Sequence, residues 1–180
     1  MPAEGAMRYN VAGLLKAPTG EMRESELADV VRLDDPQLEL IAPVRGHVKL
    51  IRDPGGISVE AHLTTQVATQ CSRCLAPVEA ELEFEIEESF RPTVHIPGGP
   101  PVVGPDDDDV ATHIDELHTL DLTEVVRQAI LLAAPINPLC RADCPGLCPT
   151  CGRDLREGAC ECAPEPDPRW DALRDILSEG

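Results

Sequence analysis

Eight cysteines lie in two stretches of this 180-residue chain, and thiolate chemistry is the first chemistry that its residues offer. The first stretch is Cys71-Ser-Arg-Cys74. Two thiolates that flank a tight turn can bind one metal ion, and the amide groups of the turn favour their negative charge. The second stretch holds six cysteines, and Gly152 after Cys148-Pro-Thr-Cys151 permits the positive φ angle of a metal-binding knuckle.

Structural zinc prefers a closed tetrahedron of four thiolates, so eight cysteines divide naturally into two sites. The first predicted site joins the hairpin turn to a later segment and consists of Cys71, Cys74, Cys140 and Cys144. The second lies in the C-terminal tail and consists of Cys148, Cys151, Cys160 and Cys162. That tail is too short and polar to fold by burial alone, so metal would supply its folding energy. We therefore expect two Zn²⁺ ions as cofactors, and one site with four spare thiols is the alternative.

Other cysteine chemistries compete with zinc. The spacing Cys144-x3-Cys148-x2-Cys151 matches a radical-SAM triad, but the 29 residues after Cys151 are too few for the barrel that such enzymes need. An iron–sulfur cluster or redox-active cysteines remain an alternative, because thiolates suit both metals. Disulfides are disfavoured, because the N-terminus carries no secretory signal and cytoplasmic thiols stay reduced.

The sequence contains no catalytic constellation. Four-cysteine sites are closed, whereas catalytic zinc keeps an open position. His47 and His62 are expected to meet Glu83 on the polar face of a sheet, which is typical of a solvated cross-strand cluster. His113 and His118 could replace a metal ligand, although surface loop positions explain them as well. We predict that the protein is not an enzyme and takes no small-molecule substrate.

The charge of the chain restricts its partners. Fifteen Lys plus Arg stand against 33 Asp plus Glu, a formal charge of −18. Nucleic-acid affinity comes largely from cations, so extensive RNA contact is disfavoured, and the acidic surface suits a basic protein partner or simply keeps the chain soluble. No apolar run approaches the roughly 20 residues that span a bilayer. We expect a cytoplasmic protein without membrane contact.

Residues 37–91 alternate between apolar and polar side chains, the pattern of half-buried strands. The apolar side chains of the three strands are Leu38, Leu40, Val44, Val48 and Leu50, then Ile57, Val59, Ala61, Leu63 and Val67, then Val78, Ala80, Leu82, Phe84 and Ile86. A turn at residues 53–56 sets Lys49 opposite Glu60, and a turn at Ser72-Arg73 sets Glu60 opposite Glu85. We predict an antiparallel meander with one face in water, preceded by weaker strands at about residues 8–16 and 26–33.

A helix is predicted after the sheet. Asp121 and Glu124 have the spacing of a capping box, and Pro135 ends the helix. Its apolar stripe consists of Leu122, Val125, Val126, Ala129, Ile130 and Ala133. A second helix is expected near the C-terminus, capped by Asp167, begun by Pro168 and lined by Trp170, Leu173, Ile176 and Leu177.

These elements predict an α+β fold, an antiparallel β meander or partly open barrel with one main helix and a cysteine-rich zinc-binding C-terminal tail. Residues 1–139 would form the sheet-plus-helix domain, with a flexible acidic and proline-rich loop at 92–109. Residues 140–180 would form the zinc module with its C-terminal helix.

Several motifs occur in a specific order. They are Cys71-Ser-Arg-Cys74-Leu75 before an acidic strand, Ile114-Asp115 ahead of Asp121-Leu122, the run from Pro135 to Cys140, and the stretch from Cys144 to Leu155 followed by Cys160-Glu-Cys162. In this order the chain resembles the YceD family of large ribosomal RNA subunit accumulation proteins, over roughly residues 8–178. The resemblance implies a bacterial ribosome-biogenesis factor that supports synthesis, processing or stability of 23S ribosomal RNA, with no established reaction.

Because the charge disfavours broad RNA contact, our hypothesis is that the protein acts through the large-subunit precursor or a basic ribosomal protein. The predicted docking surface is the row Glu79, Glu81, Glu83, Glu85 and Glu87, which could equally be a solvated sheet face. The runner-up is a zinc-ribbon RNA-binding module that uses Arg73, Arg141, Arg153 and Arg156 around the metal sites.

Overall fold

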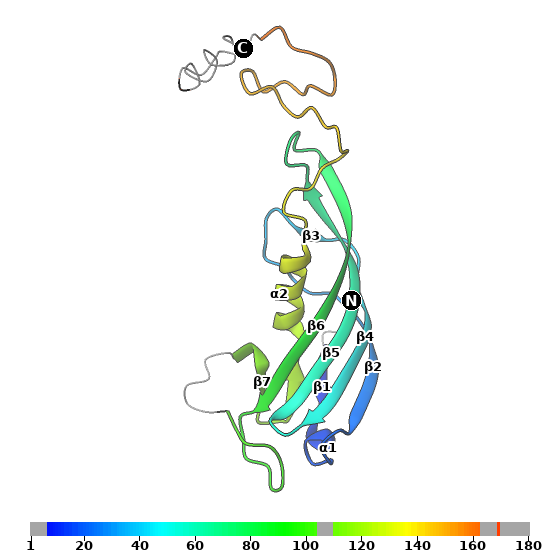
Figure 1. The fold of residues 1–180 in the computed structure, drawn as a ribbon, viewed down its shortest axis with the longest axis vertical. Coiled ribbons are helices and arrows are strands. Elements are labelled where there is room, and N and C mark those ends of the chain that lie inside the picture. The colour runs from blue at the N-terminus through cyan, green and yellow to red at the C-terminus, as the bar shows by residue number, and fades with distance from the viewer. Residues whose placement is uncertain (1–6, 104–109, 163–168, 170–180) are drawn as a thin grey trace, which may run out of the picture.

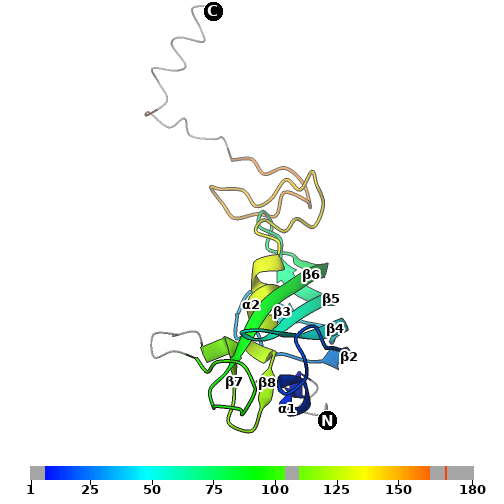
Figure 2. The same cartoon turned by 60° about the horizontal axis from the view of Figure 1, so that its bottom comes forward.

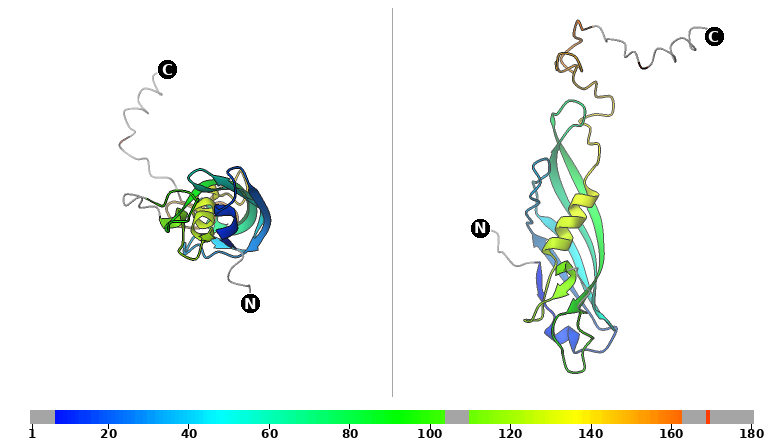
Figure 3. Two further views of the ribbon diagram at one scale, coloured as in Figure 1. Left: turned by 90° about the horizontal axis from the view of Figure 1, so that it is seen from below. Right: turned by 90° about the vertical axis from the view of Figure 1, so that its left-hand side faces the viewer.

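The computed structural model describes residues 7–103, 110–162 and 169. The fold is mostly β, a sheet curled into a half-barrel around one main helix (Figures 1 and 3). In chain order the elements are β1 Arg8–Asn10, α1 Ala12–Leu15, β2 Met22–Asp29, β3 Glu39–Leu40, β4 Val44–Asp53, β5 Gly56–Gln70, β6 Pro77–Pro92, the 3₁₀ turn Val110–Thr112, β7 His113–Ile114, β8 Thr119–Asp121 and α2 Thr123–Ala133. The helical part of the predicted α+β class is therefore mainly α2.

The strands follow the order β1-β8-β7-β6-β5-β4-β2, and β3 pairs with β5. The predicted meander is present, because β4, β5 and β6 are joined as antiparallel neighbours. One pair departs from it: β7 runs parallel to the last two residues of β6, since the chain makes a long excursion before it returns to the sheet. The weaker strand predictions, at about residues 8–16 and 26–33, were only partly right. In the first segment only β1 is a strand, and residues 12–15 form the short helix α1. The second strand, β2, lies earlier than predicted, at Met22–Asp29.

The two predicted hairpin registers had different outcomes. Lys49 pairs with Glu60 and His47 with His62, as predicted. Across β5 and β6, however, Glu60 pairs with Glu87 and His62 with Glu85, two residues beyond the predicted partners. The connection between these strands is Cys71–Ala76 and not a two-residue turn. A shift of two residues keeps every side chain on its face, so the alternation pattern could not detect it.

The core fills the concave side of the sheet. The apolar side chains predicted for the three strands are buried there, except Leu40, Val78 and Ala80, which are half-buried. The predicted first strand is interrupted at residues 41–43, so Leu40 lies in β3 and Leu38 before it. The stripe of α2 closes the core over β6, with Leu122, Val126 and Ile130 fully buried. The sheet curls far enough that the Arg23 guanidinium donates to the carbonyl oxygen of Asn10 at 3.3 Å, which brings its two outer strands together.

The start of α2 differs from the prediction. Asp121 is the last residue of β8, and its carboxylate accepts a hydrogen bond from the Thr123 N–H at 2.9 Å. The N-cap is Leu122. Glu124 does not reach back to Asp121 as a capping box requires, because Arg127 donates two hydrogen bonds to it at 2.8 and 2.6 Å. The helix ends at Ala133, and its C-cap Ala134 is already extended before Pro135, as predicted.

Two predicted segments lie wholly or partly outside the described residues: the C-terminal helix, and positions 104–109 of the acidic loop. Residues 93–103 contain turns but no helix or strand, and Ile96 anchors them by burial in the core. The cysteine-rich segment after α2 lies at one end of the half-barrel, beyond the tip of the β5–β6 hairpin (Figure 2). No helix in the described part of the chain has the length and apolar character needed to cross a membrane.

Two glycines make the close strand packing possible. A Cβ atom at Gly46 would collide with the backbone carbonyl oxygen of His62, and one at Gly56 with that of Phe90. We expect Gly46→Ala and Gly56→Ala each to lower the free energy of unfolding by about 1–3 kcal/mol, measured in urea, because backbone must move to admit the methyl group. Gly13→Ala is the control, since a Cβ there meets no atom within 4 Å. Equal stability of all three variants would contradict this packing.

Candidate metal centres

The first cysteine pair sits in the loop at the tip of the β5–β6 hairpin. The Cys71 N–H donates to the carbonyl oxygen of Ala76 at 2.8 Å, and the Leu75 N–H donates to that of Cys71 at 2.9 Å. Leu75 adopts a positive φ of 61°, which reverses the chain after the second thiol. This local fold buries both Cys71 and Cys74 and directs them to the same side.

Backbone contacts hold the segment after α2 against this loop. The Ser72 N–H donates to the carbonyl oxygen of Pro138 at 2.8 Å, and the Leu147 N–H donates to that of Arg73 at 3.0 Å. The Arg73 guanidinium donates in return to the carbonyl oxygen of Cys144 at 2.9 Å. The two segments are therefore docked on both sides of the cysteines.

The first group of thiols consists of Cys71, Cys74, Cys140 and Cys144, whose sulfur atoms all lie within 4.8 Å of one another. The Cys71 and Cys144 sulfurs are 3.9 Å apart, and the Cys74 and Cys140 sulfurs are 3.6 Å apart. Four sulfurs at a zinc–sulfur distance of about 2.3 Å would be about 3.8 Å apart in a regular tetrahedron. The spacing fits a four-thiolate metal site and is far longer than a disulfide bond of about 2.05 Å.

The second group consists of Cys148, Cys151, Cys160 and Cys162, again with all sulfur atoms within 4.8 Å of one another. The Gly152 N–H donates to the carbonyl oxygen of Cys148 at 2.9 Å, with Gly152 at a φ of 73°. The Cys148 N–H donates to the carbonyl oxygen of Arg153 at 2.8 Å, which closes the knuckle. Only Cys148 of this group is buried, whereas three of the four cysteines of the first group are, so the second group lies nearer to solvent.

Both groups favour thiolate at one cysteine. The pKa of Cys71 is lowered to about 6, chiefly by a hydrogen bond from the backbone of Cys140. The pKa of Cys148 is lowered to about 6, chiefly by a hydrogen bond from the backbone of Cys151. The pKa of Cys162 is raised to about 12 by its interaction with Cys151 and by burial. A bound cation would offset the free energy needed to deprotonate Cys162, because metal ions coordinate and stabilise deprotonated thiols.

The structure thus brings the eight cysteines together in the two sets of four that their spacing predicted. Each set has the four sulfur donors that a metal ion needs, and metal binding itself stays a prediction. Neither set, among the described residues, includes His113 or His118.

The glutamate row lies on the outer face of β6, with all five side chains exposed. The Glu85 carboxylate is 3.1 Å from the Nδ1 atom of His62, so one of the five glutamates has a partner within the sheet. His47 and His62 are neighbours on that face, as predicted, but they meet Glu85 and not Glu83. The row lies on the outer face of β6, whereas of the cysteines only Cys71 and Cys74 belong to this hairpin, at its tip.

A sequence profile described as large ribosomal RNA subunit accumulation protein YceD matches residues 59–177. This chain belongs to the YceD family. The matched range begins in β5 and covers the β5–β6 hairpin, α2 and both cysteine groups. The resemblance in the ordered motifs is confirmed.

Similar proteins occur in species of Mycobacterium and in Bacillus subtilis. An uncharacterised protein of Mycobacterium tuberculosis is 33% identical over 122 residues, which are 68% of this chain and 56% of that protein. One of Mycobacterium leprae is 28% identical over 141 residues, 78% of this chain and 62% of that protein. The uncharacterised YlbN of Bacillus subtilis is 28% identical over 158 residues, which are 86% of this chain and 85% of that protein. The chain spans little more than half the length of these mycobacterial relatives, and no solved structure matches it significantly.

Sequence reasoning missed one positioning residue of this YceD protein. Arg73 was considered for RNA contact, yet its guanidinium holds the backbone of Cys144 beside the hairpin loop. The contact joins residues 71 positions apart, so no local pattern could reveal it.

Single substitutions test whether the two groups are independent metal sites. We expect Cys144→Ser to lower the metal content, measured by mass spectrometry of the purified chain, by one equivalent, and Cys160→Ser to do the same. The double variant should retain none, because each closed site needs four thiolates. Ser72→Ala is the matched control, because Ser72 lies between the proposed ligands Cys71 and Cys74 and is not itself a member of the group. Loss of all metal in either single variant would contradict two separate sites.

Proposed function

We propose that this protein is a non-enzymatic, zinc-binding cytoplasmic factor that supports the accumulation of the large ribosomal subunit and its 23S RNA. The observation that carries the proposal is the YceD match over residues 59–177, which includes both four-cysteine groups. The family description points to large-subunit accumulation, and each cysteine group offers four thiol ligands for one metal ion.

Zinc is the proposed metal for both groups. All four donors in each group are thiols, and a closed four-thiolate tetrahedron leaves no position for a substrate or an activated water. This donor set supports a structural and not a catalytic role. An iron–sulfur cluster is the competing occupant, and it differs by visible absorbance, which zinc does not produce.

The proposed partner is a basic protein of the large subunit, which would dock on the glutamate row of β6. Glu87 stands directly across from Glu60, and like charges in opposed positions of a sheet destabilise it. Lys49, 3.0 Å from Glu60, offsets part of that repulsion. Glu79, Glu81 and Glu83 form no ion pair with any residue that the structure describes, so their charge is available to an external cation.

The alternative, a zinc-ribbon RNA-binding module, has weaker support. Arg141 lies 3.3 Å from the Asp143 carboxylate, and Arg156 lies 2.6 Å from that of Asp154. Arg73 is engaged by Cys144. Three of the four arginines considered for RNA therefore have protein partners, which reduces their value as phosphate contacts.

Association with the large subunit can be measured in growing cells. We expect a tagged copy of the chain to co-migrate with large-subunit precursors in a sucrose gradient, because an accumulation factor must meet its particle. Nuclease treatment separates the two hypotheses: a basic protein that stays bound after digestion favours protein docking, and loss of all binding favours RNA contact. A chain that stays at the top of the gradient in every growth phase would count against the ribosomal function.

Charge reversal tests the glutamate row. We expect Glu79→Lys, Glu81→Lys and Glu83→Lys together to reduce co-migration about tenfold or more, because a basic partner would meet repulsion. The same charge change at the exposed positions Glu21, Glu24 and Glu116 is the control. Thermal unfolding shows whether both triple variants remain folded. Equal co-migration of the two would remove the row as a docking surface.

A further inference from the structure

The β6 strand has an open edge. One edge pairs with β5 along its whole length, from Pro77 to Phe90. The other edge pairs with β7 only at Arg91 and Pro92, and no described strand pairs with it between Pro77 and Phe90. In an antiparallel strand every second residue directs its N–H and C=O away from the paired neighbour, so backbone groups on this edge can accept another strand.

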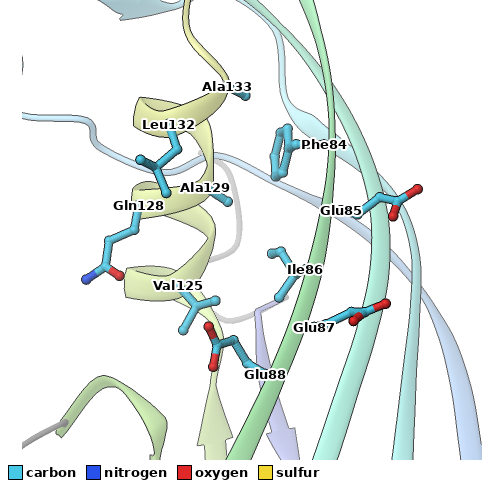
Figure 4. A pocket seen from close by; sticks show the side chains of 10 residues that line it. All are labelled: Phe84, Glu85, Ile86, Glu87, Glu88, Val125, Gln128, Ala129, Leu132 and Ala133. Atoms are coloured by element: carbon cyan, nitrogen blue, oxygen red, sulfur yellow. The ribbon is translucent and has the colours of Figure 1, made fainter.

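A groove runs along this edge beside α2. Its volume is 420 Å³, and it is lined by Phe84, Glu85, Ile86, Glu87 and Glu88 of β6 and by Val125, Gln128, Ala129, Leu132 and Ala133 of α2. Successive side chains of a strand point to opposite faces, so a groove that touches five consecutive residues follows the strand's edge and not one face. Figure 4 shows this arrangement: Phe84 and Ile86 point toward α2, while Glu85 and Glu87 point away from it.

The groove has an apolar wall and a charged rim. Leu132 is 87% exposed, the largest exposure of an apolar side chain on α2, and it stands at the groove without cover from the described residues. Glu88 lies beside Val125 inside the groove, and Glu87 lies on the outer face (Figure 4). An occupant therefore needs apolar side chains toward α2 and cations toward the carboxylates.

We propose that the edge of β6 and the face of α2 together bind an extended basic segment of a large-subunit protein as an added strand. This rests on the proposed function for the identity of the partner. Backbone hydrogen bonds to the edge would supply affinity, and alternate side chains would enter the groove or meet the glutamates. Charge complementarity selects the occupant, because pairing two copies of this edge would bring two glutamate rows together.

The binding test uses the full metal-loaded chain and fluorescent peptides that tile the basic tails of large-subunit proteins. We expect at least one peptide with alternating apolar and basic residues to bind, and Leu132→Glu to weaken it about tenfold or more by placing a charge in the apolar groove. Leu117→Glu is the matched control, because Leu117 is 77% exposed and lies outside the groove. Equal binding by both variants, or no binding by any peptide, would overturn the proposal.

Two further readouts identify the mode of binding. Hydrogen exchange of alternate β6 amides between Leu82 and Glu88 should slow in the complex, and N-methylation of the peptide amides that face β6 should abolish binding. Protection confined to other strands would overturn strand addition. A wild-type chain that co-migrates with large-subunit precursors while no peptide binds would reject the groove and leave the proposed function standing. Peptide binding without co-migration would reject the proposed function and leave the groove standing.

Discussion

The convergence of four thiols at the tip of the β5–β6 hairpin is the contact on which the arrangement of the C-terminal half depends. The two strands carry Cys71 and Cys74 to the far end of the half-barrel, and the chain after α2 returns Cys140 and Cys144 to the same point. Without a shared ion, four thiols at this spacing have no net attraction that would hold them together. The backbone bonds between the loop and residues 138–147 help to hold the two segments together.

This junction also determines where α2 lies. The helix is tied to the sheet at both ends, through β8 before it and through the cysteine segment after it. Its buried stripe packs over β6, while Leu132 remains exposed beside the open edge. The groove exists because α2 covers the concave face of β6 and leaves the strand's outer edge unpaired among the described residues. The positions of the cysteine groups, of α2 and of the groove thus follow from one chain path.

The glutamates serve two physical roles on the same strand. Their repulsion discourages two copies of β6 from pairing at the open edge, which is a common means of protecting sheet edges from aggregation. The same charges lie next to a site with unpaired backbone groups and an apolar wall. Such a surface repels a second copy of itself and attracts basic chains, which is the property that the proposed basic partner requires.

The sequence by itself determined which side chains face the core, which cysteines group together and where α2 ends, because these follow from local periodicity, from ligand spacing and from the absence of an N–H in Pro135. Tertiary structure decided the rest. The six-residue loop shifted Glu60 from Glu85 to Glu87, a change that period-two alternation cannot register. Arg127 drew Glu124 away from the predicted cap. The parallel β6–β7 pair, the Arg73–Cys144 contact and the open edge arise between residues distant in the chain, so only the folded path could establish them.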